Sequence, residues 1–234
     1  REAPPPAGAP LRDDITEPLG LVGVLGNGRA FGFGPDETGG LRPQHDGAGP
    51  TPKGRVDMRA IRAMDIGTAL RWTFASEAYL VHYVVPGLER FPRINKPGLA
   101  HWLELGKPAP VASVLIVDVD NPGHATWRSA DEATDVLGHV HQLLPQAGVY
   151  ATSRGYRITQ PLDRWLPVTE LEPVLAAYRD ELGKTGIHAD EACRDWTRLN
   201  RVPRYHTRVR DKTTGRWLPV FHAPAAAFIS TLEL

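Results

Sequence analysis

The sequence predicts a mixed α/β fold of the α+β class, in which antiparallel strands carry helices. A continuous run of aliphatic residues from Val114 to Val117 is typical of a strand buried on both faces. Two later segments, 129–144 and 169–182, have apolar residues at helical spacing. A strand, a tight turn and a return strand lie between them at 148–160. The second half therefore has the predicted order strand, helix, strand, strand, helix, strand, strand.

In the first half, residues 1–18 are rich in Pro and Ala, which predicts a flexible tail. Leu19–Leu25 predicts a strand, Gly26–Gly28 is a hairpin turn signal, and Arg29–Phe33 is the predicted return strand. Residues 34–54 contain many Gly and Pro, so we expect a long loop there.

The rest of the first half gives mixed signals. Val56–Met64 predicts a short helix because its apolar residues recur at helical spacing. Ser76–Val85 combines helix and strand signals, and Phe91–Pro97 predicts a loop. Gly98–Leu105 predicts a second short helix, which carries Trp102.

The two longer helices have predicted caps. Ser129 and Glu132 have the spacing of a capping box at the start of the first helix. Thr169 and Glu172 repeat this spacing, and Gly183 is expected to end the second helix.

The C-terminal part predicts shorter elements. Ile187–Asp190 is a predicted strand that ends in a carboxylate. Tyr205–Arg210 and Arg216–Phe221 are the predicted arms of a hairpin, with Lys212–Gly215 at its tip. The Ala-rich segment from Ala223 is predicted to start a helix.

These elements predict four parts. They are a tail (1–18), an N-terminal α/β module (19–110), a second module (111–222) and a C-terminal linker (223–234). Because the chain begins with Arg and not Met, we expect it to be a domain of a longer protein.

Composition restricts the class of protein. Apolar residues make up 41% of the chain and charged residues 23%, as in globular domains. No stretch approaches the roughly 18 consecutive apolar residues of a membrane span. The single cysteine, Cys193, excludes an internal disulfide and a multi-cysteine zinc site, and it predicts a reducing, cytoplasmic setting.

The overall charge is balanced, with 27 basic and 27 acidic residues, but its distribution is uneven. Between positions 194 and 216, eight basic residues stand against Asp195 and Asp211. Such a segment attracts phosphates if it folds onto one face, although charged residues also protect the edge of a solvated hairpin. The basic residues are Arg194, Arg198, Arg201, Arg204, Arg208, Arg210, Lys212 and Arg216.

The predicted buried strand ends in two carboxylates, Asp118 and Asp120. Residues two apart in a strand share a face, so these side chains are expected to lie side by side. Their mutual repulsion and desolvation raise the free energy of the ionised pair, and a divalent cation such as Mg²⁺ or Mn²⁺ removes this cost. The alternative is a strand end in solvent without a function.

Three motifs now follow one another along the chain. They are Asp118-Val-Asp120, then Ser153-Arg-Gly-Tyr-Arg157, then Asp190 followed by Thr197-Arg-Leu-Asn-Arg-Val-Pro203. In this order and spacing the chain resembles the archaeo-eukaryotic primase superfamily, and most nearly the primase-polymerase domains of plasmid and phage replication proteins. The resemblance covers roughly residues 112–204, which is less than half of the chain.

The resemblance implies a fold and a metal centre. Residues 111–222 would form a catalytic core with an RRM-like antiparallel sheet and helices, and the N-terminal module would pack against it. Asp118 and Asp120 would hold two divalent ions, Mg²⁺ or Mn²⁺. Asp190 would complete the acidic set, with Asp195 as the alternative third carboxylate. Two such ions activate a 3′-hydroxyl and stabilise the leaving pyrophosphate.

The resemblance also implies binding residues. Guanidinium groups suit phosphates, so the nucleotide ligands would be Ser153, Arg154, Arg157, Arg198 and Arg201. The nucleic-acid contacts would be Arg204, Arg208, Arg210 and Lys212. The chain departs from the family at Arg157, where the family motif ends in His. Arginine cannot exchange a proton near neutral pH, so Arg157 would join Asp118, Asp120 and Asp190 in the catalytic set as a phosphate ligand.

The function implied by the resemblance is a DNA-dependent nucleotidyltransferase, a primase and/or DNA polymerase of plasmid, phage or mobile-element replication. Its partners would be a single-stranded or primed DNA template and (d)NTPs. A helicase or other replication domain would lie elsewhere in the parent chain. One alternative is a catalytically inactive module that binds single-stranded nucleic acid. Another is a metal-dependent glycosyltransferase with the same two carboxylates.

Overall fold

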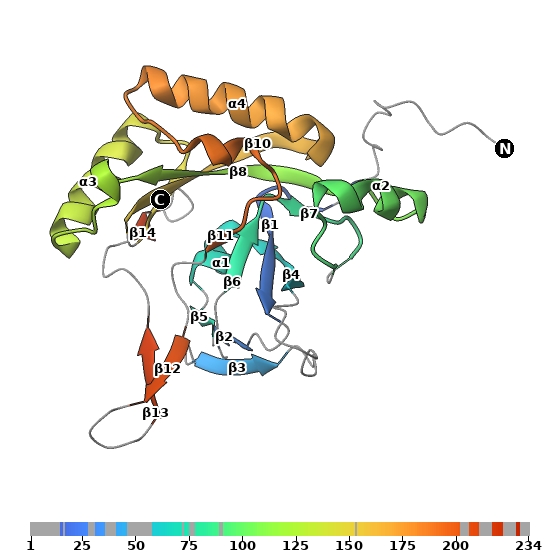
Figure 1. Cartoon of the computed structure of the whole chain (residues 1–234), viewed down its shortest axis with the longest axis horizontal. Helices are drawn as coiled ribbons and strands as arrows, with labels where there is room; N and C mark the ends of the chain where they lie inside the picture. The colour runs from blue at the N-terminus through green and yellow to red at the C-terminus, as the bar shows by residue number, and fades with distance from the viewer. Residues whose placement is uncertain are drawn as a thin grey trace.

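Figure 1 shows the computed structural model of the chain. The structure describes residues 15, 17–27, 31–35, 41–45, 58–71, 73–74, 78–88, 91–152, 154–201, 206–210, 217–221 and 228–229. These residues form two main antiparallel sheets, two smaller sheets and several helices, which confirms the mixed α/β class.

The larger sheet has five strands in the order β14-β9-β10-β8-β7, and every neighbouring pair is antiparallel. In that order the strands are Phe228–Ile229, Gly148–Thr152, Gly155–Pro167, Val111–Asp120 and Tyr83–Val84. The second sheet has the order β11-β6-β1-β4 and is also antiparallel. Its strands are Asn200–Arg201, Ala78–Val81, Leu21–Asn27 and Met58–Asp65.

The remaining elements are shorter sheets and helices. The small sheets are β3-β2-β5 (Leu41–His45, Phe31–Pro35, Thr73–Phe74) and the hairpin β12-β13 (His206–Arg210, Trp217–Phe221). The helices are α1 (Ile66–Arg71), α2 (Lys96–Glu104), α3 (Ala130–Leu143) and α4 (Val168–Lys184), with 3-10 turns η2 (Pro122–His124) and η3 (Glu191–Arg194). None of the helices that the structure describes is long and apolar enough to cross a membrane.

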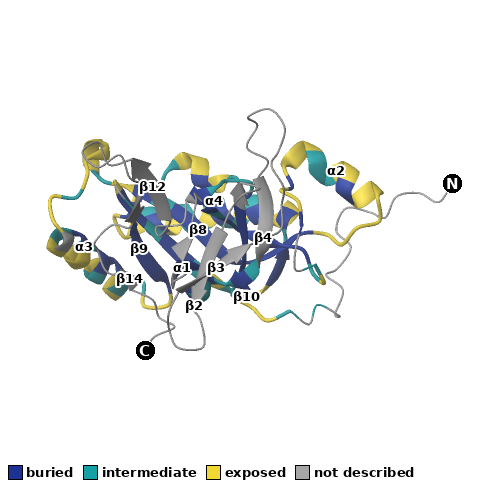
Figure 2. Cartoon of the chain, turned by 90° about the horizontal axis from the view of Figure 1, so that it is seen from below, coloured by how far each residue is buried: buried dark blue, intermediate teal, exposed yellow. Residues whose placement is uncertain are grey.

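Strand β8 lies at the centre of the protein and is buried on both faces, as its sequence predicts. Leu115 and Val117 belong to the core under α3 and α4, whereas Val114 and Ile116 belong to the core shared with the four-stranded sheet. Figure 1 shows α4 on one side of β8, the four-stranded sheet on the other, and α3 at the left end of the five-stranded sheet. Figure 2 shows that β8 and β9 are buried while the outer sides of α2 and α3 are exposed.

The two halves of the chain share their sheets. Strand β7 comes from the N-terminal half and pairs with β8, and β11 comes from the C-terminal half and pairs with β6. Glu17, at the end of the predicted tail, accepts hydrogen bonds from the Trp165 indole (3.0 Å) and the Gly87 amide (3.0 Å). The predicted module boundary at 110/111 is therefore crossed by both sheets.

Three predictions in the first half are wrong. The predicted helix Val56–Met64 is largely strand β4, in which Met64 pairs with Val22 of β1. Both sides of β1 are taken by β4 and β6, so β2 is not its hairpin partner and pairs with β3 and β5 instead. The predicted loop 34–54 contains β3. Long-range pairing with β1 decides β4 and leaves no local signal in the sequence, whereas β3 pairs with the nearby strand β2.

The helix ends are partly as predicted. The Ser129 hydroxyl accepts a hydrogen bond from the Glu132 amide (3.1 Å) at the start of α3. Helix α4, in contrast, begins at Val168 without a side-chain cap, so the predicted capping role of Thr169 is wrong. It runs through Gly183, and Gly186 takes the left-handed conformation (φ 84°) just beyond its end.

The C-terminal predictions are also only partly confirmed. The hairpin is confirmed as β12-β13, and its tip lies outside the described residues. The predicted strand Ile187–Asp190 is an irregular segment that leads into η3. The predicted C-terminal helix is wrong at Phe228–Ile229, which pair with β9 as an edge strand.

Candidate functional site

The candidate site lies where β8 ends. Asp118 and Asp120 are two residues apart on this strand, so they share the face that turns toward the four-stranded sheet. On the neighbouring strand β10, Arg157 lies opposite Asp118 and Gly155 lies opposite Asp120. The register thereby brings the first two sequence motifs together. Tyr156 joins the core on the opposite face of the sheet.

Gly155 is required by this register. A Cβ atom at position 155 would lie 2.0 Å from the carbonyl oxygen of Val119, which belongs to the backbone of β8. Only a residue without a side chain permits this approach at the start of β10. The glycine of the second motif therefore has a structural reason that is independent of any ligand.

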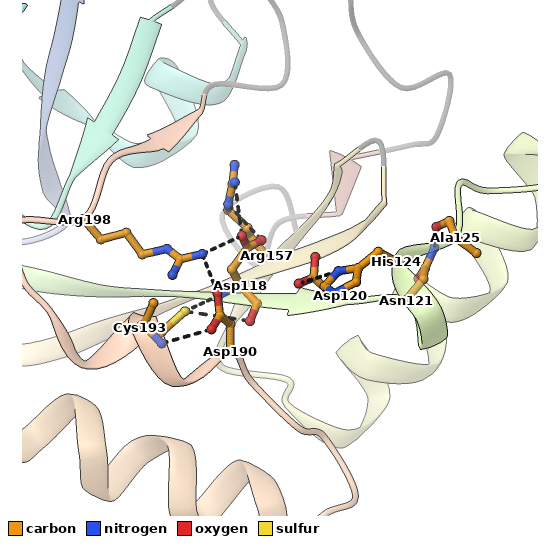
Figure 3. A network of polar contacts seen from close by, with 10 residues as sticks. Asp118, Asp120, Asn121, His124, Ala125, Arg157, Asp190, Cys193 and Arg198 are labelled. Atoms are coloured by element: carbon orange, nitrogen blue, oxygen red, sulfur yellow. Dashed lines mark hydrogen bonds and ion pairs between the residues drawn. The ribbon is translucent and has the colours of Figure 1, made fainter.

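Two arginines bind the carboxylate of Asp118, as Figure 3 shows. Arg157 Nε lies 3.1 Å from Asp118 Oδ1, and Arg157 Nη2 lies 3.4 Å from Oδ2. Arg198 Nη2 lies 3.1 Å from the same Oδ2 atom. Both carboxylate oxygens of Asp118 are thus engaged by guanidinium groups.

Arg198 also binds the third predicted carboxylate. Its Nη2 atom lies 2.8 Å from Asp190 Oδ2, so one nitrogen links Asp118 and Asp190 (Figure 3). Asp190 Oδ1 accepts a hydrogen bond from the Ala192 amide (3.0 Å) and so begins η3. This hydrogen bond, together with the Arg198 charge, holds the pKa of Asp190 below its usual range despite partial burial.

The segment around η3 is anchored directly to β8. The Asp190 amide donates to the Asp118 carbonyl oxygen (2.9 Å), and the Asp118 amide donates to Cys193 Sγ (3.0 Å). Cys193 is buried, and burial raises the pKa of its thiol. The sequence identified Cys193 only as a lone cysteine, and nothing in its spacing indicates this contact.

Arg157 lies inside the protein. Its side chain is 11% exposed, and its guanidinium carbon lies 5.9 Å from the centre of the Tyr150 ring on β9. Burial lowers the pKa of Arg157, but the adjacent Tyr150 and Asp118 outweigh this effect and raise it. The guanidinium therefore remains charged, and its position favours a partner role toward Asp118.

Asp120 lies at the open end of the site. Its Oδ2 atom is 3.2 Å from His124 Nδ1, and both side chains are largely exposed. His124 ends the turn η2 and has a positive φ of 53°, which is uncommon for a residue with a side chain. His124 was not predicted from the sequence, where the available signal was its position four residues after Asp120.

Asp195 belongs to a different set of contacts. Its Oδ1 atom accepts hydrogen bonds from the amide and the hydroxyl of Thr197 (2.9 Å each) and lies 3.7 Å from Lys96 Nζ. Burial raises its pKa, but these partners outweigh burial and leave the pKa below the usual range. Of the two candidates for the third carboxylate, Asp190 is the one in the network of Asp118.

The other predicted binding residues are only partly described. Arg154 is exposed at the turn before β10, where its carbonyl oxygen accepts from the Asn121 amide (2.8 Å). Arg201 pairs through its backbone with Tyr79 in β11. Arg208 and Arg210 lie on β12. The remaining predicted binding residues lie outside the described residues. They are Ser153, Arg204 and Lys212.

The carboxylates of Asp118, Asp120 and Asp190 have the chemistry of Mg²⁺ or Mn²⁺ ligands, and the metal centre remains a prediction. Within the described ranges, no three His, Cys, Asp or Glu side chains are placed to hold one ion. The two oxygens of Asp118 bind Arg157 and Arg198. Guanidinium groups therefore supply positive charge beside Asp118.

Comparison with known proteins adds no family. No protein-family model matches the chain. A search of curated proteins also finds no relative.

Proposed function

We propose that the chain is a DNA-dependent nucleotidyltransferase of the primase-polymerase type. The proposal depends on one observation above all: Asp118 and Asp190, which are far apart in sequence, bind the same nitrogen of Arg198. Arg157 of the second motif joins them at Asp118. Three sequence motifs thus contribute to one polar network at the end of a central strand, beside an exposed Asp120.

In this proposal the arginines have different roles. Arg198 has a side chain that is 21% exposed, so an incoming triphosphate can reach it from solvent. Arg157 is more deeply buried and holds the Asp118 carboxylate in place. The proposed requirement for Mg²⁺ or Mn²⁺ demands that Asp118 exchange these arginine partners.

The proposed template is single-stranded or primed DNA. Strand β12 contains Arg208 and Arg210 within the basic segment that follows the third motif. A concentration of positive charge suits a phosphate backbone. We further propose that the protein replicates a plasmid, phage or other mobile element in the cytoplasm. The parent protein would also contain a helicase or similar domain.

A second candidate is a nucleic-acid-binding module without catalysis. One observation favours it: both oxygens of Asp118 are already paired with guanidinium groups. Such a module would use its basic surface and leave the carboxylates as structural partners of the arginines.

Nucleotide incorporation tests the proposal. Purified protein is incubated with Mn²⁺ or Mg²⁺, labelled dNTPs or NTPs, and primed or unprimed single-stranded templates. We expect template-dependent incorporation by the wild type and a loss of at least about 100-fold in Asp118→Asn and Asp120→Asn. Asp163→Asn is the matched control, because Asp163 is an exposed carboxylate on β10 outside the network.

The outcomes separate the candidates. DNA binding that weakens steeply with salt, without any incorporation, supports the non-catalytic module. Template-independent turnover of a nucleotide sugar supports the glycosyltransferase alternative. Incorporation that survives Asp118→Asn at the wild-type rate rejects the assignment of this site.

A further inference from the structure

Four charged side chains form a chain of alternating sign across the candidate site. Arg157 binds Asp118, Asp118 binds Arg198, and Arg198 binds Asp190, with the shortest nitrogen–oxygen distances at 3.1, 3.1 and 2.8 Å. Two guanidinium groups face two carboxylates, so the formal charge of the set is zero. The set is electrostatically satisfied without any ligand.

Burial makes the pairing of the inner members important. The Arg157 and Asp118 side chains are only 11% and 13% exposed. A buried charge that loses its partner is strongly destabilising, whereas an exposed charge is compensated by water. Any ligand that removes one member of this chain must therefore compensate the partner that remains.

A divalent cation alone cannot do this. To reach the oxygens of Asp118 it must displace Arg157 or Arg198, and it would then lie beside the positive guanidinium groups. A phosphate ligand alone meets the opposite difficulty. It would draw Arg198 away, which leaves Asp190 without its ion-pair partner and Asp118 with Arg157 alone.

Both ligands together satisfy every charge. The phosphates of a nucleoside triphosphate pair with the guanidinium groups, and the cation pairs with the carboxylates. Arg198 is the central member, because its Nη2 atom holds one oxygen of Asp118 and one of Asp190. Moving this one side chain breaks the ion pair of Asp190 and removes one of the two arginine partners of Asp118 (Figure 3).

We propose that the chain Arg157–Asp118–Arg198–Asp190 excludes a divalent cation or a triphosphate alone and admits the two together by exchange of ion-pair partners. This inference rests on the proposed function, since that function supplies the two ligands. By thermodynamic linkage, each ligand raises the affinity for the other by the same factor.

The first arm of the test measures Mn²⁺ binding without nucleotide, by electron paramagnetic resonance of the free ion. Arg198→Gln removes the guanidinium that pairs with Asp190 and with one oxygen of Asp118, so this variant is expected to bind Mn²⁺ at least about tenfold more tightly than the wild type. Arg157→Gln should change the affinity in the same direction. Arg164→Gln is the matched control, because Arg164 is an exposed arginine on the same strand as Arg157.

The second arm measures binding of an α,β-methylene deoxynucleoside triphosphate in EDTA by calorimetry. Asp118→Asn removes the negative charge that pairs with Arg157 and Arg198, so this variant is expected to bind the metal-free triphosphate at least about tenfold more tightly than the wild type. Asp163→Asn serves as the control and should match the wild type. Thermal unfolding checks that each variant is folded. If Arg157→Gln does not fold, the Mn²⁺ measurement still stands on Arg198→Gln, because Arg198 is partly exposed.

Unchanged Mn²⁺ affinity in Arg198→Gln, or unchanged triphosphate affinity in Asp118→Asn, overturns the exchange. Neither arm measures nucleotidyl transfer, so the two proposals fail separately. Tightened binding in both arms without incorporation would support the exchange and reject the polymerase. Incorporation by the wild type, without tighter binding in the variants, would support the polymerase and reject the exchange.

Discussion

His82 lies between β6 and β7 with its side chain fully buried. Neither of its ring nitrogens has a hydrogen-bond partner among the residues that the structure describes. Burial lowers the pKa of His82 from 6.5 to about 4, and the negative charge of Asp195 offsets only part of this effect. The imidazole is therefore neutral in the folded protein at neutral pH, and protonation opposes folding.

His82 should make the free energy of unfolding depend on pH. Between pH 6.5 and 4 the unfolded chain takes up a proton at His82 and the folded protein does not, so stability falls as pH falls through this window. The full shift corresponds to a loss of about 3 kcal/mol. Urea denaturation at pH 7 and pH 4.5 measures it. His82→Leu should lose about 2–3 kcal/mol less than the wild type between these two values. An identical pH dependence in both proteins would contradict the assignment.

The sequence predicted several residues of the network for sound local reasons. Asp118 and Asp120 are identified by a buried strand that ends in two carboxylates, and Arg198 by its place in a basic segment. His124 and Cys193 were missed, because their contacts depend on a turn conformation and on a segment folding back to β8. The buried position of Arg157 was also not predictable, since it depends on the register of β10 against β8 and on Tyr150 of the next strand.

Among the elements, the two long helices begin in different ways although their sequences have the same capping spacing. Ser129 caps α3 through its hydroxyl, and Glu132 turns toward Arg128. Thr169 lies within the first turn of α4, because Pro167 precedes the helix and Val168 is buried in the core. Tertiary burial therefore overrides the local cap signal at α4.

This difference predicts unequal costs of two similar substitutions. Ser129→Ala removes a cap and is expected to lower the free energy of unfolding by about 1 kcal/mol. Thr169→Ala removes no cap, so the change should stay within about 0.5 kcal/mol. Chemical denaturation of the two variants beside the wild type measures both. Equal destabilisation would show that Thr169 does cap α4.

Two glycines give a matched test of the β8–β10 register. Gly155→Ala forces a Cβ atom against the Val119 carbonyl, and we expect a loss of about 2 kcal/mol or more. Gly138→Ala on α3 has open space around its Cβ and should stabilise the helix by up to about 1 kcal/mol. Thermal unfolding compares them. A neutral Gly155→Ala would mean that β10 does not approach β8 as closely as this structure has it.

At the level of elements, the sequence predicted what is locally encoded. The central strand, α3, the β9–β10 turn and the β12-β13 hairpin have clear periodicity or turn residues, and the structure confirms them. Strand β4 was mistaken for a helix because a short apolar recurrence fits both periods, and only pairing with β1 decides between them. The same limit explains the wrong partner assigned to β2.

The whole molecule is connected by strands exchanged between its two main sheets. Strand β7 extends the five-stranded sheet, and β11 extends the four-stranded sheet. Their shared core joins Val22 and Val24 of β1 to Val114 and Ile116 of β8. Burying aliphatic side chains of this size contributes about 1.5–3 kcal/mol each, so separating the sheets would expose a large part of the core.

The exchange of strands predicts that the two sheets unfold together. Val24→Ala removes two buried methyl groups from the four-stranded sheet and should cost about 2 kcal/mol. If unfolding is cooperative, the slowest amides of α4, on the far side of β8, should exchange with solvent about 30-fold faster, because they exchange only through global unfolding. Hydrogen exchange followed by mass spectrometry measures both regions. Faster exchange confined to β1, β4 and β6, with α4 unchanged, would mean that the sheets are separate folding units and that the polar network at Asp118 can persist without the four-stranded sheet.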